Sequence, residues 1–207
     1  GTVKALEKEI NNPLNILTNV YGIGIKKAQD LVKQDIKSIE DLKQHTDKLN
    51  DKQIIGLKYY DDILKRIPRS EIEEYKNIFE KIFNKVKEPD AKFEIVGSFR
   101  RGAKNSGDID IIINNKNTFD KFIEELIKDN ILIEMLTDGK TKKLTIAKLP
   151  GKPARRIDFL YSAPEEYAFA ILYFTGSKAF NVVMRRRALA LNYTLNEHGL
   201  SDMKEKV

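Results

Sequence analysis

The spacing of apolar residues predicts helices in the first part of the chain. Up to Pro68, short apolar groups recur at helical spacing and are separated by turn-forming residues such as Gly22-Ile23-Gly24. A longer helix is predicted to start with Ser70 as its N-cap and Glu73 completing a capping box, and to stop before Pro89. The chain therefore begins with a group of short helices followed by one long helix.

Beyond this long helix, apolar and polar residues alternate, which predicts strands. The segments expected as strands are 93–96, 108–113, 143–149 and 156–161, with a helix over 119–127. From Pro164 onward the apolar spacing becomes helical again. Helices, then a mixed sheet, then helices predict an α+β fold.

Three carboxylates are placed so that they can converge on one face of this sheet. Side chains alternate along a strand, so Asp108 and Asp110 point to one face and Ile109 to the other. Asp158 lies on the 156–161 strand between apolar neighbours of the opposite parity. An Asp-X-Asp pair alone is more often a solvated strand face. With the third carboxylate and the residues described next, we expect a site for two divalent cations, since Mg²⁺ prefers oxygen ligands.

The segment before Asp108 carries groups that suit a phosphate. Gly97-Ser98 follows a strand and supplies a tight turn with a hydroxyl, where backbone N–H groups can surround phosphate oxygens. Arg100 or Arg101 adds a forked positive charge, and Ser106-Gly107 adds a second hydroxyl and amide. Without the carboxylates nearby, the two arginines are equally compatible with a solvated basic loop.

Two further motifs are weaker when each is taken alone. The glycines of Gly22-Ile23-Gly24, followed by Lys26, let the backbone approach a phosphate, although any tight helix–helix turn has this pattern. Tyr173-Phe174, followed by Asn181 and Arg185, suits stacking and minor-groove contacts. A buried aromatic pair beside a basic helix face is an equal alternative for this second motif.

Composition narrows the class of protein only modestly. The 207 residues suggest one or two compact units, and 37 Lys and Arg against 31 Asp and Glu suit a polyanionic partner without identifying one. The absence of cysteine excludes disulfides and thiolate metal sites and fits an intracellular protein. No apolar run approaches the ~18 residues that a membrane helix needs, so no membrane association is expected.

Six stretches, in order, resemble the family X DNA polymerases of the polymerase beta type. They are 22–24, 55–59 with 66–69, 97–102, 107–110, 155–158 and 173–177. The resemblance covers nearly the whole chain, whereas a generic nucleotidyltransferase would share only the Gly-Ser and Asp-X-Asp pairs. It implies a helix-hairpin-helix DNA-binding subdomain, a nucleotidyltransferase palm and an incomplete nucleotide-selection subdomain, over residues 1–69, 70–163 and 164–207.

The resemblance implies template-directed addition of dNTPs to a primer 3′-hydroxyl in short gaps, as in base excision repair, by two-metal phosphoryl transfer. Two Mg²⁺ ions would serve the reaction, with Mn²⁺ as a substitute, and Na⁺ or K⁺ would bind at the hairpin. The expected partners are a dNTP and gapped or primer-template DNA, with the protein a monomer. A template-independent or RNA-directed nucleotidyltransferase and a non-catalytic DNA-binding scaffold are the alternatives.

The resemblance also implies roles for residues that match its motifs. The catalytic metal ligands would be Asp108, Asp110 and Asp158. The nucleotide would be bound by Arg66, Ser98, Arg101, Ser106, Gly107, Tyr173, Phe174, Gly176 and Asn181. DNA would be bound by Gly22, Gly24, Lys26, Lys142, Arg156 and Arg185. The monovalent cation would be bound by the backbone carbonyls of Thr18, Val20 and Ile23.

Further details follow from matches and departures. Tyr173-Phe174 would exclude ribonucleotides and, in place of the Trp-Gly of terminal transferases, favours templated synthesis; the Gly176–Ser177 peptide would be cis. The family's N-terminal lyase domain and final helices lie outside this sequence, so lyase activity is not expected. Lys178 replaces an acidic residue near the incoming base, and Leu160 replaces an arginine near the catalytic aspartate.

Overall fold

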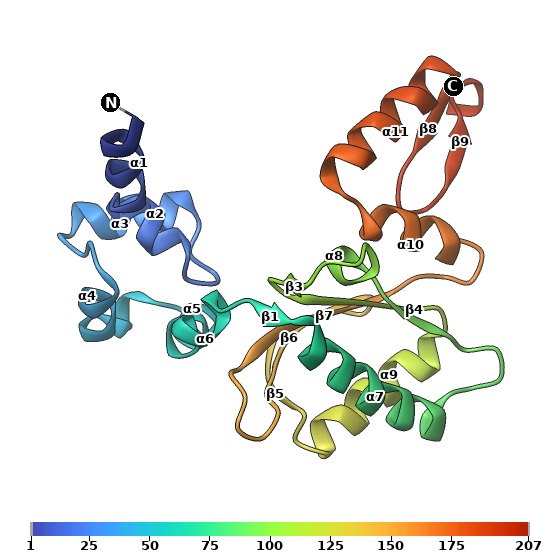
Figure 1. Ribbon diagram of the computed structural model, residues 1–207, viewed down its shortest axis with the longest axis horizontal. Helices are drawn as coiled ribbons and strands as arrows, with labels where there is room; N and C mark the ends of the chain where they lie inside the picture. The colour runs from blue at the N-terminus through green and yellow to red at the C-terminus, as the bar shows by residue number, and fades with distance from the viewer. Residues whose placement is uncertain (1, 207) are drawn as a thin grey trace. The chain divides into compact units, whose positions relative to one another are not determined.

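The structure is a computed structural model that describes residues 2–206. The chain forms two compact units, Gly1–Lys65 and Arg66–Val207. The division falls just before β1 (Ile67–Pro68), because this strand pairs with β3 (Asn105–Ser106) of the second unit. Figure 1 shows the elements of each unit along the chain.

The first unit is helical, as the apolar spacing predicts. Its elements are α1 (Thr2–Ile10), α2 (Pro13–Thr18), α3 (Ile25–Lys33), α4 (Ile39–Gln44), the 3₁₀ helix η1 (Thr46–Lys48), α5 (Asp51–Lys58) and α6 (Tyr60–Leu64). Side-chain caps define several helix starts: Asn12 caps α2, Ser38 caps α4, and Asn50 with Gln53 forms a capping box on α5. Apolar residues from α2 to α5 form one buried cluster that holds these short helices together.

The second unit is built on a mixed five-stranded sheet, which confirms the predicted α+β fold. The strand order is β2 (Phe93–Ile95), β4 (Ile109–Ile113), β7 (Arg155–Tyr161), β6 (Lys142–Ala147) and β5 (Leu132–Asp138). The neighbours β4 and β7 run parallel, whereas the other pairs are antiparallel. The centre of the sheet is thus a parallel pair contributed by segments far apart in the sequence.

Two helices cover one face of this sheet, and the opposite face carries the polar residues of interest. The helices α7 (Arg69–Val86) and α9 (Lys116–Lys128) bury an aromatic core that includes Phe79, Phe122 and Phe159 (Figure 1). On the other face, α8 (Gly97–Arg100) and α10 (Tyr167–Thr175) lie near β4, where Ile112 packs with Ala170. Alternation along β4 therefore separates an isoleucine-rich core face from the face that carries Asp110.

Two predictions about element boundaries and caps are wrong. Ser70 is not an N-cap, because α7 begins at Arg69, directly after β1, with no side-chain cap. The Arg69 amide instead donates to the Lys104 carbonyl at 2.9 Å, so a tertiary contact satisfies this helix end. Glu73 lies 3.9 Å from the Arg69 guanidinium rather than completing a capping box.

Three groups of strands were not predicted. The paired strands β1 and β3 have two residues each, too few to show alternation. The strand β5 has register shifts between Leu132 and Glu134 and between Met135 and Thr137, and such bulges interrupt the alternation that marks a strand. After α11 (Lys178–Ala190), where only helices were expected, β8 (Tyr193–Leu195) and β9 (Leu200–Asp202) form a hairpin that leads to η2 (Met203–Lys206). The strand β8 packs against α11, and β9 pairs with β8, contacts that their local sequence does not indicate.

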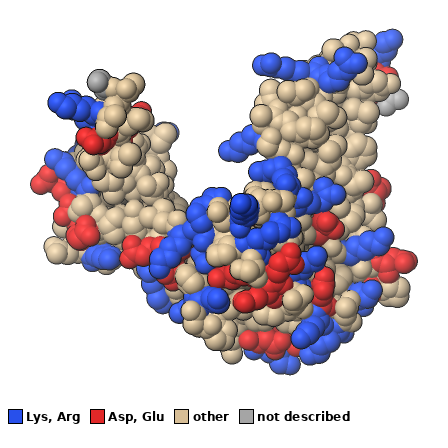
Figure 2. Space-filling model, in the orientation of Figure 1, with Lys and Arg blue, Asp and Glu red and all other residues tan. Residues whose placement is uncertain are grey.

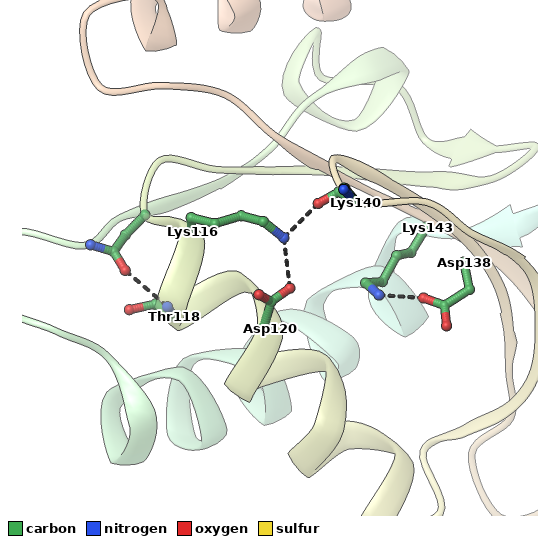
Figure 3. A network of polar contacts seen from close by, with 7 residues as sticks. Lys116, Thr118, Asp120, Asp138, Lys140 and Lys143 are labelled. Atoms are coloured by element: carbon green, nitrogen blue, oxygen red, sulfur yellow. Dashed lines mark hydrogen bonds and ion pairs between the residues drawn. The ribbon is translucent and has the colours of Figure 1, made fainter.

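Polar contacts hold the turn between β5 and β6 onto the start of α9 (Figure 3). The Lys116 ammonium donates to the Asp120 carboxylate at 2.8 Å and to the Lys140 carbonyl at 2.6 Å. Within the hairpin, Lys143 pairs with Asp138. These contacts fix the end of β6 that carries Lys142 toward the polar face of the sheet. Of the helices in residues 2–206, none has the length and apolar character that a membrane crossing requires.

Candidate active site

Strand register brings the three predicted carboxylates together. In the parallel β4–β7 pair, Asp110 is the direct partner of Asp158. Asp108 lies one residue before β4, rather than within the strand as predicted, and is exposed. One carboxylate oxygen from each of the three residues lies within 4.8 Å of the others. This set of oxygen ligands can hold a metal ion.

The electrostatics of the cluster also suit a cation. Burial, followed by the charges of Asp108 and Asp158, raises the pKa of Asp110 to about 7. Burial likewise raises the pKa of Asp158, although Arg156, whose guanidinium donates to it at 2.5 Å, opposes this effect. Like charges held this close are unfavourable without a counter-ion, so a divalent cation would relieve the repulsion.

The predicted phosphate-binding segment wraps beside the carboxylates. Gly97 has φ of +66°, and a Cβ at this position would lie 3.1 Å from the Asp110 carboxylate, so glycine is required here on both counts. The turn predicted at Gly97-Ser98 is the start of α8. The Ser98 hydroxyl donates to the Ser106 hydroxyl at 2.6 Å. The two predicted hydroxyls are therefore adjacent, one on α8 and one on β3.

Arg66 lies next to the start of β4, within the same unit as the carboxylates. Its guanidinium donates to the side chain of Asn105 at 2.8 Å and to the Asn105 carbonyl at 3.3 Å. Its Nη1 lies 3.2 Å from the position that a Cβ on Gly107 would occupy. Arg66 is exposed, so its remaining donors face solvent beside Gly107 and Asp108.

The arginines of the phosphate-binding segment reach the end of α10. Arg101 donates to the Thr175 carbonyl at 2.6 Å, and Arg100 donates to the Thr175 hydroxyl at 3.2 Å. The Gly176–Ser177 peptide that follows is cis, as the resemblance implies. Arg101 Nη1 lies 3.3 Å from the position of a Cβ on Gly176, so two predicted nucleotide-binding residues are neighbours.

A second cluster gathers around Tyr173. The rings of Tyr173 and Phe174 meet edge to face at 4.9 Å, and the Asn181 amide donates to the Tyr173 carbonyl at 2.8 Å. The Arg185 guanidinium lies over the Tyr173 ring at 4.8 Å from its centroid. These predicted residues thus come from α10 and α11 and form one group.

A small cavity connects the carboxylates with the aromatic cluster. Its volume is about 60 Å³, and it is lined by Asp110, Asp158, Lys142 and Phe174 together with apolar residues. Leu160, on β7, also lines it. Lys142 is exposed and contributes positive charge beside Asp110 and Asp158. The predicted DNA-binding lysine therefore belongs to the same site as Asp110 and Asp158.

Basic side chains gather over the region of β3 and α8 in Figure 2. Exposed basic residues in this region are Arg100 on α8, Arg101 and Lys104 between α8 and β3, and Arg66 directly before β1. A positive surface directly beside a carboxylate cluster suits a ligand that carries both phosphates and metal ions.

The predicted hairpin motif forms between α2 and α3 in the first unit. Gly22 has φ of +89°, a conformation that favours glycine, and Gly24 is the N-cap of α3. The Val20 carbonyl accepts from the Ile23 amide at 3.1 Å, while Thr18 ends α2. Lys26, in the first turn of α3, is exposed.

Sequence reasoning missed two residues that hold this hairpin in place. The Gln53 side chain donates to the Gly22 carbonyl at 2.9 Å, and a Cβ on Gly56 would lie only 2.3 Å from the Tyr21 carbonyl oxygen. The signals were a glycine in the middle of a predicted helix and the Asn50-x-x-Gln53 capping pattern. Both residues show that α5 packs directly on the hairpin backbone.

We expect Gly56→Ala to destabilise the first unit by about 2 kcal/mol. In an open helix, alanine would gain about 1 kcal/mol over glycine, but here the new methyl group meets a backbone oxygen that cannot move freely. Chemical denaturation followed by circular dichroism measures the change. Gly24→Ala is the comparison: no atom lies within 4 Å of its Cβ position, so it should lose only the roughly 1 kcal/mol by which glycine is the better N-cap of α3. Equal stability of the two variants would contradict the tight packing of α5 on the hairpin.

Comparison with known proteins places this geometry in context. The DNA polymerase beta palm matches residues 66–164, the fingers domain of DNA polymerase lambda matches 15–64, and the DNA polymerase beta thumb matches 170–207. The polymerase palm match contains the three convergent carboxylates, and in the sequence it follows the fingers match and precedes the thumb match, which places the chain in the polymerase class of the nucleotidyltransferase fold. More particularly, the chain belongs to the family X DNA polymerases.

Curated relatives agree with this assignment. DNA polymerase lambda of Rattus norvegicus is 35% identical over 204 residues, covering 91% of this chain and 35% of the relative. DNA polymerase lambda of Arabidopsis thaliana is 31% identical, covering 90% and 38%, and DNA nucleotidylexotransferase of Xenopus laevis is 28% identical, covering 97% and 48%. The chain thus spans less than half the length of each of these relatives.

Proposed function

We propose that the protein is a template-directed DNA polymerase that adds dNTPs to a primer 3′-hydroxyl in short gaps. The observation that carries this proposal is the pairing of Asp110 with Asp158 in register, with Asp108 close by, in a chain of family X. The relatives named DNA polymerase lambda support the templated activity. A role in DNA repair, including base excision repair, is part of the same proposal.

Asp108, Asp110 and Asp158 would hold two Mg²⁺ ions, with Mn²⁺ as a substitute. The fit is supported by their mutual distances and by the raised pKa of Asp110, which is caused first by burial and then by the charges of Asp108 and Asp158. When bound, the ions would supply charge neutralisation at the attacking and leaving oxygens of phosphoryl transfer. Arg156 orients Asp158 through its 2.5 Å hydrogen bond and would lie beside the primer terminus.

The chain's own donors would align the triphosphate. The hydroxyls of Ser98 and Ser106, the amide of Gly107 and the guanidinium groups of Arg66 and Arg101 would bind its phosphate oxygens. Two contacts support this set: Ser98 donates to Ser106, and Arg66 lies beside Gly107. Such fixed donors contribute by alignment and by stabilising charge, which is most of what an enzyme can supply in phosphoryl transfer.

The aromatic cluster would select the nucleotide. Tyr173 and Phe174 would exclude a ribose 2′-hydroxyl, with the Gly176 backbone close to the sugar. Asn181 and Arg185 would read the minor-groove edge of the nascent pair. Because both contact Tyr173 in the free protein, DNA would compete with that ring for Arg185.

The hairpin and Lys142 would contact DNA, and the chain would be divided into three subdomains. The hairpin glycines Gly22 and Gly24 with Lys26 would hold a DNA backbone, through Na⁺ or K⁺ bound by carbonyls of Thr18, Val20 and Ile23. Lys142 would contact DNA near the primer. We propose a DNA-binding subdomain over 1–69, a palm over 70–163 and a nucleotide-selection subdomain over 164–207, acting as an intracellular monomer.

Extension of a labelled primer across a single-nucleotide gap, with Mg²⁺, tests the proposal. We expect addition of the complementary dNTP in strong preference to the other three dNTPs and to NTPs. Similarity to a DNA nucleotidylexotransferase makes template-independent addition a second candidate, which a single-stranded primer tests in parallel. Addition without regard to template would support that candidate, and DNA binding without any addition would support a scaffold.

A further inference from the structure

A buried ion pair lies in the second unit outside the carboxylate cluster. Glu71, in the first turn of α7, and Arg155, the first residue of β7, are each only 4% exposed. Arg155 Nε lies 2.5 Å from one carboxylate oxygen of Glu71, and its Nη2 lies 3.1 Å from the other. This two-point contact holds the plane of the guanidinium group in one orientation.

The same guanidinium group reaches the backbone of Arg66. Arg155 Nη1 donates to the Arg66 carbonyl at 3.2 Å. One side chain therefore joins the start of α7, the start of β7 and the residue that precedes β1. The strand β7 also carries Arg156 and Asp158, so this contact lies at the base of the candidate active site.

The Arg66 backbone determines where its side chain points. Directly after Arg66, Ile67 pairs with Ser106, which places the Arg66 side chain beside Asn105 and Gly107. Arg66 is exposed, and its guanidinium donates to Asn105 through two hydrogen bonds. A fixed carbonyl at Arg66 thus narrows the directions that its long side chain can take.

Stability alone is a weak reason for such a pair. Burying two charges is unfavourable, and a pair of well-packed apolar residues often serves stability equally well. An apolar pair, however, has no N–H group to donate to the Arg66 carbonyl. The directional donor is the property that only the charged pair supplies.

We propose that Glu71 and Arg155 are positioning residues for the incoming nucleotide. Glu71 orients Arg155, Arg155 fixes the Arg66 carbonyl, and the Arg66 guanidinium is thereby held beside Gly107 to meet the triphosphate. The inference rests on the proposed polymerase function and adds two residues to it that touch neither nucleotide nor metal.

The test exchanges the pair for apolar residues of similar size, as Glu71→Leu with Arg155→Met. Steady-state gap filling gives kcat and KM for the dNTP, thermal unfolding reports stability, and a DNA titration reports DNA affinity. We expect KM for the dNTP to rise about tenfold, with kcat within about threefold of the original value and DNA affinity unchanged. Melting temperature should fall by no more than a few degrees, which separates positioning from loss of fold.

A double-mutant comparison with Arg66→Ala makes the test specific. If the pair acts through Arg66, the apolar exchange should raise KM no further in the Arg66→Ala background. An equal additional rise in that background, or an unchanged KM in a folded exchange variant, would overturn the proposal. If the exchange variant does not fold, Arg155→Lys replaces it, since an ammonium lacks the planar fork that contacts both Glu71 oxygens and the Arg66 carbonyl together. The same KM comparison then decides. Failure of the unaltered protein to extend any primer would instead refute the proposed polymerase function.

Discussion

Replacing Asp158 by alanine is expected to reduce templated extension at least about 10³-fold, or roughly 4 kcal/mol of transition-state stabilisation. Asp158 is the partner of Asp110 in the strand register, so its loss removes a carboxylate from the centre of the cluster. It also removes the carboxylate that accepts from the Arg156 guanidinium at 2.5 Å. Single-turnover extension of a gapped primer in saturating Mg²⁺ measures the effect on the chemical step.

Two comparisons make this result interpretable. Asp138→Ala removes an exposed carboxylate on β5 that pairs with Lys143, and this variant should extend primers normally. Asp158→Asn keeps an acceptor for Arg156 while losing the charge, so it should be as inactive as the alanine variant. Retention of more than a tenth of the activity by either Asp158 variant, with intact folding, would show that the cluster is not the catalytic centre.

The second large effect is expected in the pH dependence of stability, for Asp110→Asn. The pKa of Asp110 is about 7 in the folded protein because burial and two neighbouring carboxylates disfavour its charge, whereas its ordinary value is 3.8. Between these values the folded state binds more protons than the unfolded state, so the free energy of unfolding falls as pH rises from about 4 to about 7. A shift of this size corresponds to at most about 4 kcal/mol.

Asp110→Asn removes the titrating group, so the free energy of unfolding should no longer fall over this pH range. In the absence of metal, the variant should melt several degrees higher than the unaltered protein at pH 8 and at nearly the same temperature at pH 4. Thermal unfolding across this pH range measures the difference. Asp120→Asn, an exposed carboxylate on α9, serves as the control and should not change the pH profile.

With Mg²⁺ at high pH, the unaltered protein should melt at a higher temperature than the Asp110→Asn variant. The unaltered protein should gain melting temperature with Mg²⁺ at pH 8 and less at pH 6, because protons compete with the cation for Asp110. The asparagine variant should gain little at either pH. Two results would contradict the buried position of Asp110 beside two carboxylates. One is a lower melting temperature of the Asp110→Asn variant at pH 8 without metal, and the other is an increase in its melting temperature with Mg²⁺ equal to that of the unaltered protein.

The parts of the site that depend only on neighbouring residues could be predicted from the sequence. Alternation of apolar and polar residues indicated that Asp110 and Asp158 point away from the core of their strands. Glycine patterns indicated the hairpin at Gly22 and the turn at Gly97, where the backbone has positive φ. Such features depend on a few neighbouring residues, and these can be read from a short window of sequence.

Predictions failed where contacts with a distant segment, rather than neighbouring residues, determine an element. The start of α7 has no N-cap side chain because the Lys104 carbonyl accepts from the Arg69 amide. The strand β5 is interrupted by bulges, and the β8–β9 hairpin consists of strands of three residues each, of which β8 packs on α11. Short or irregular strands acquire their stability from the surfaces they cover, so their own sequence indicates them poorly.

By itself, the sequence determined the class of fold, the polar face of each central strand and the membership of a polymerase family. Only the tertiary structure decided that β4 and β7 are parallel neighbours with Asp110 opposite Asp158, and that Arg155 reaches Glu71 across 84 positions of sequence. The physical reason is that strand order and buried ion pairs depend on how distant segments close around a common core. The spacing and propensities of neighbouring residues carry no information on which distant segments pack together. The face to which a strand residue points, and the positive φ that glycine allows, are by contrast properties of single positions.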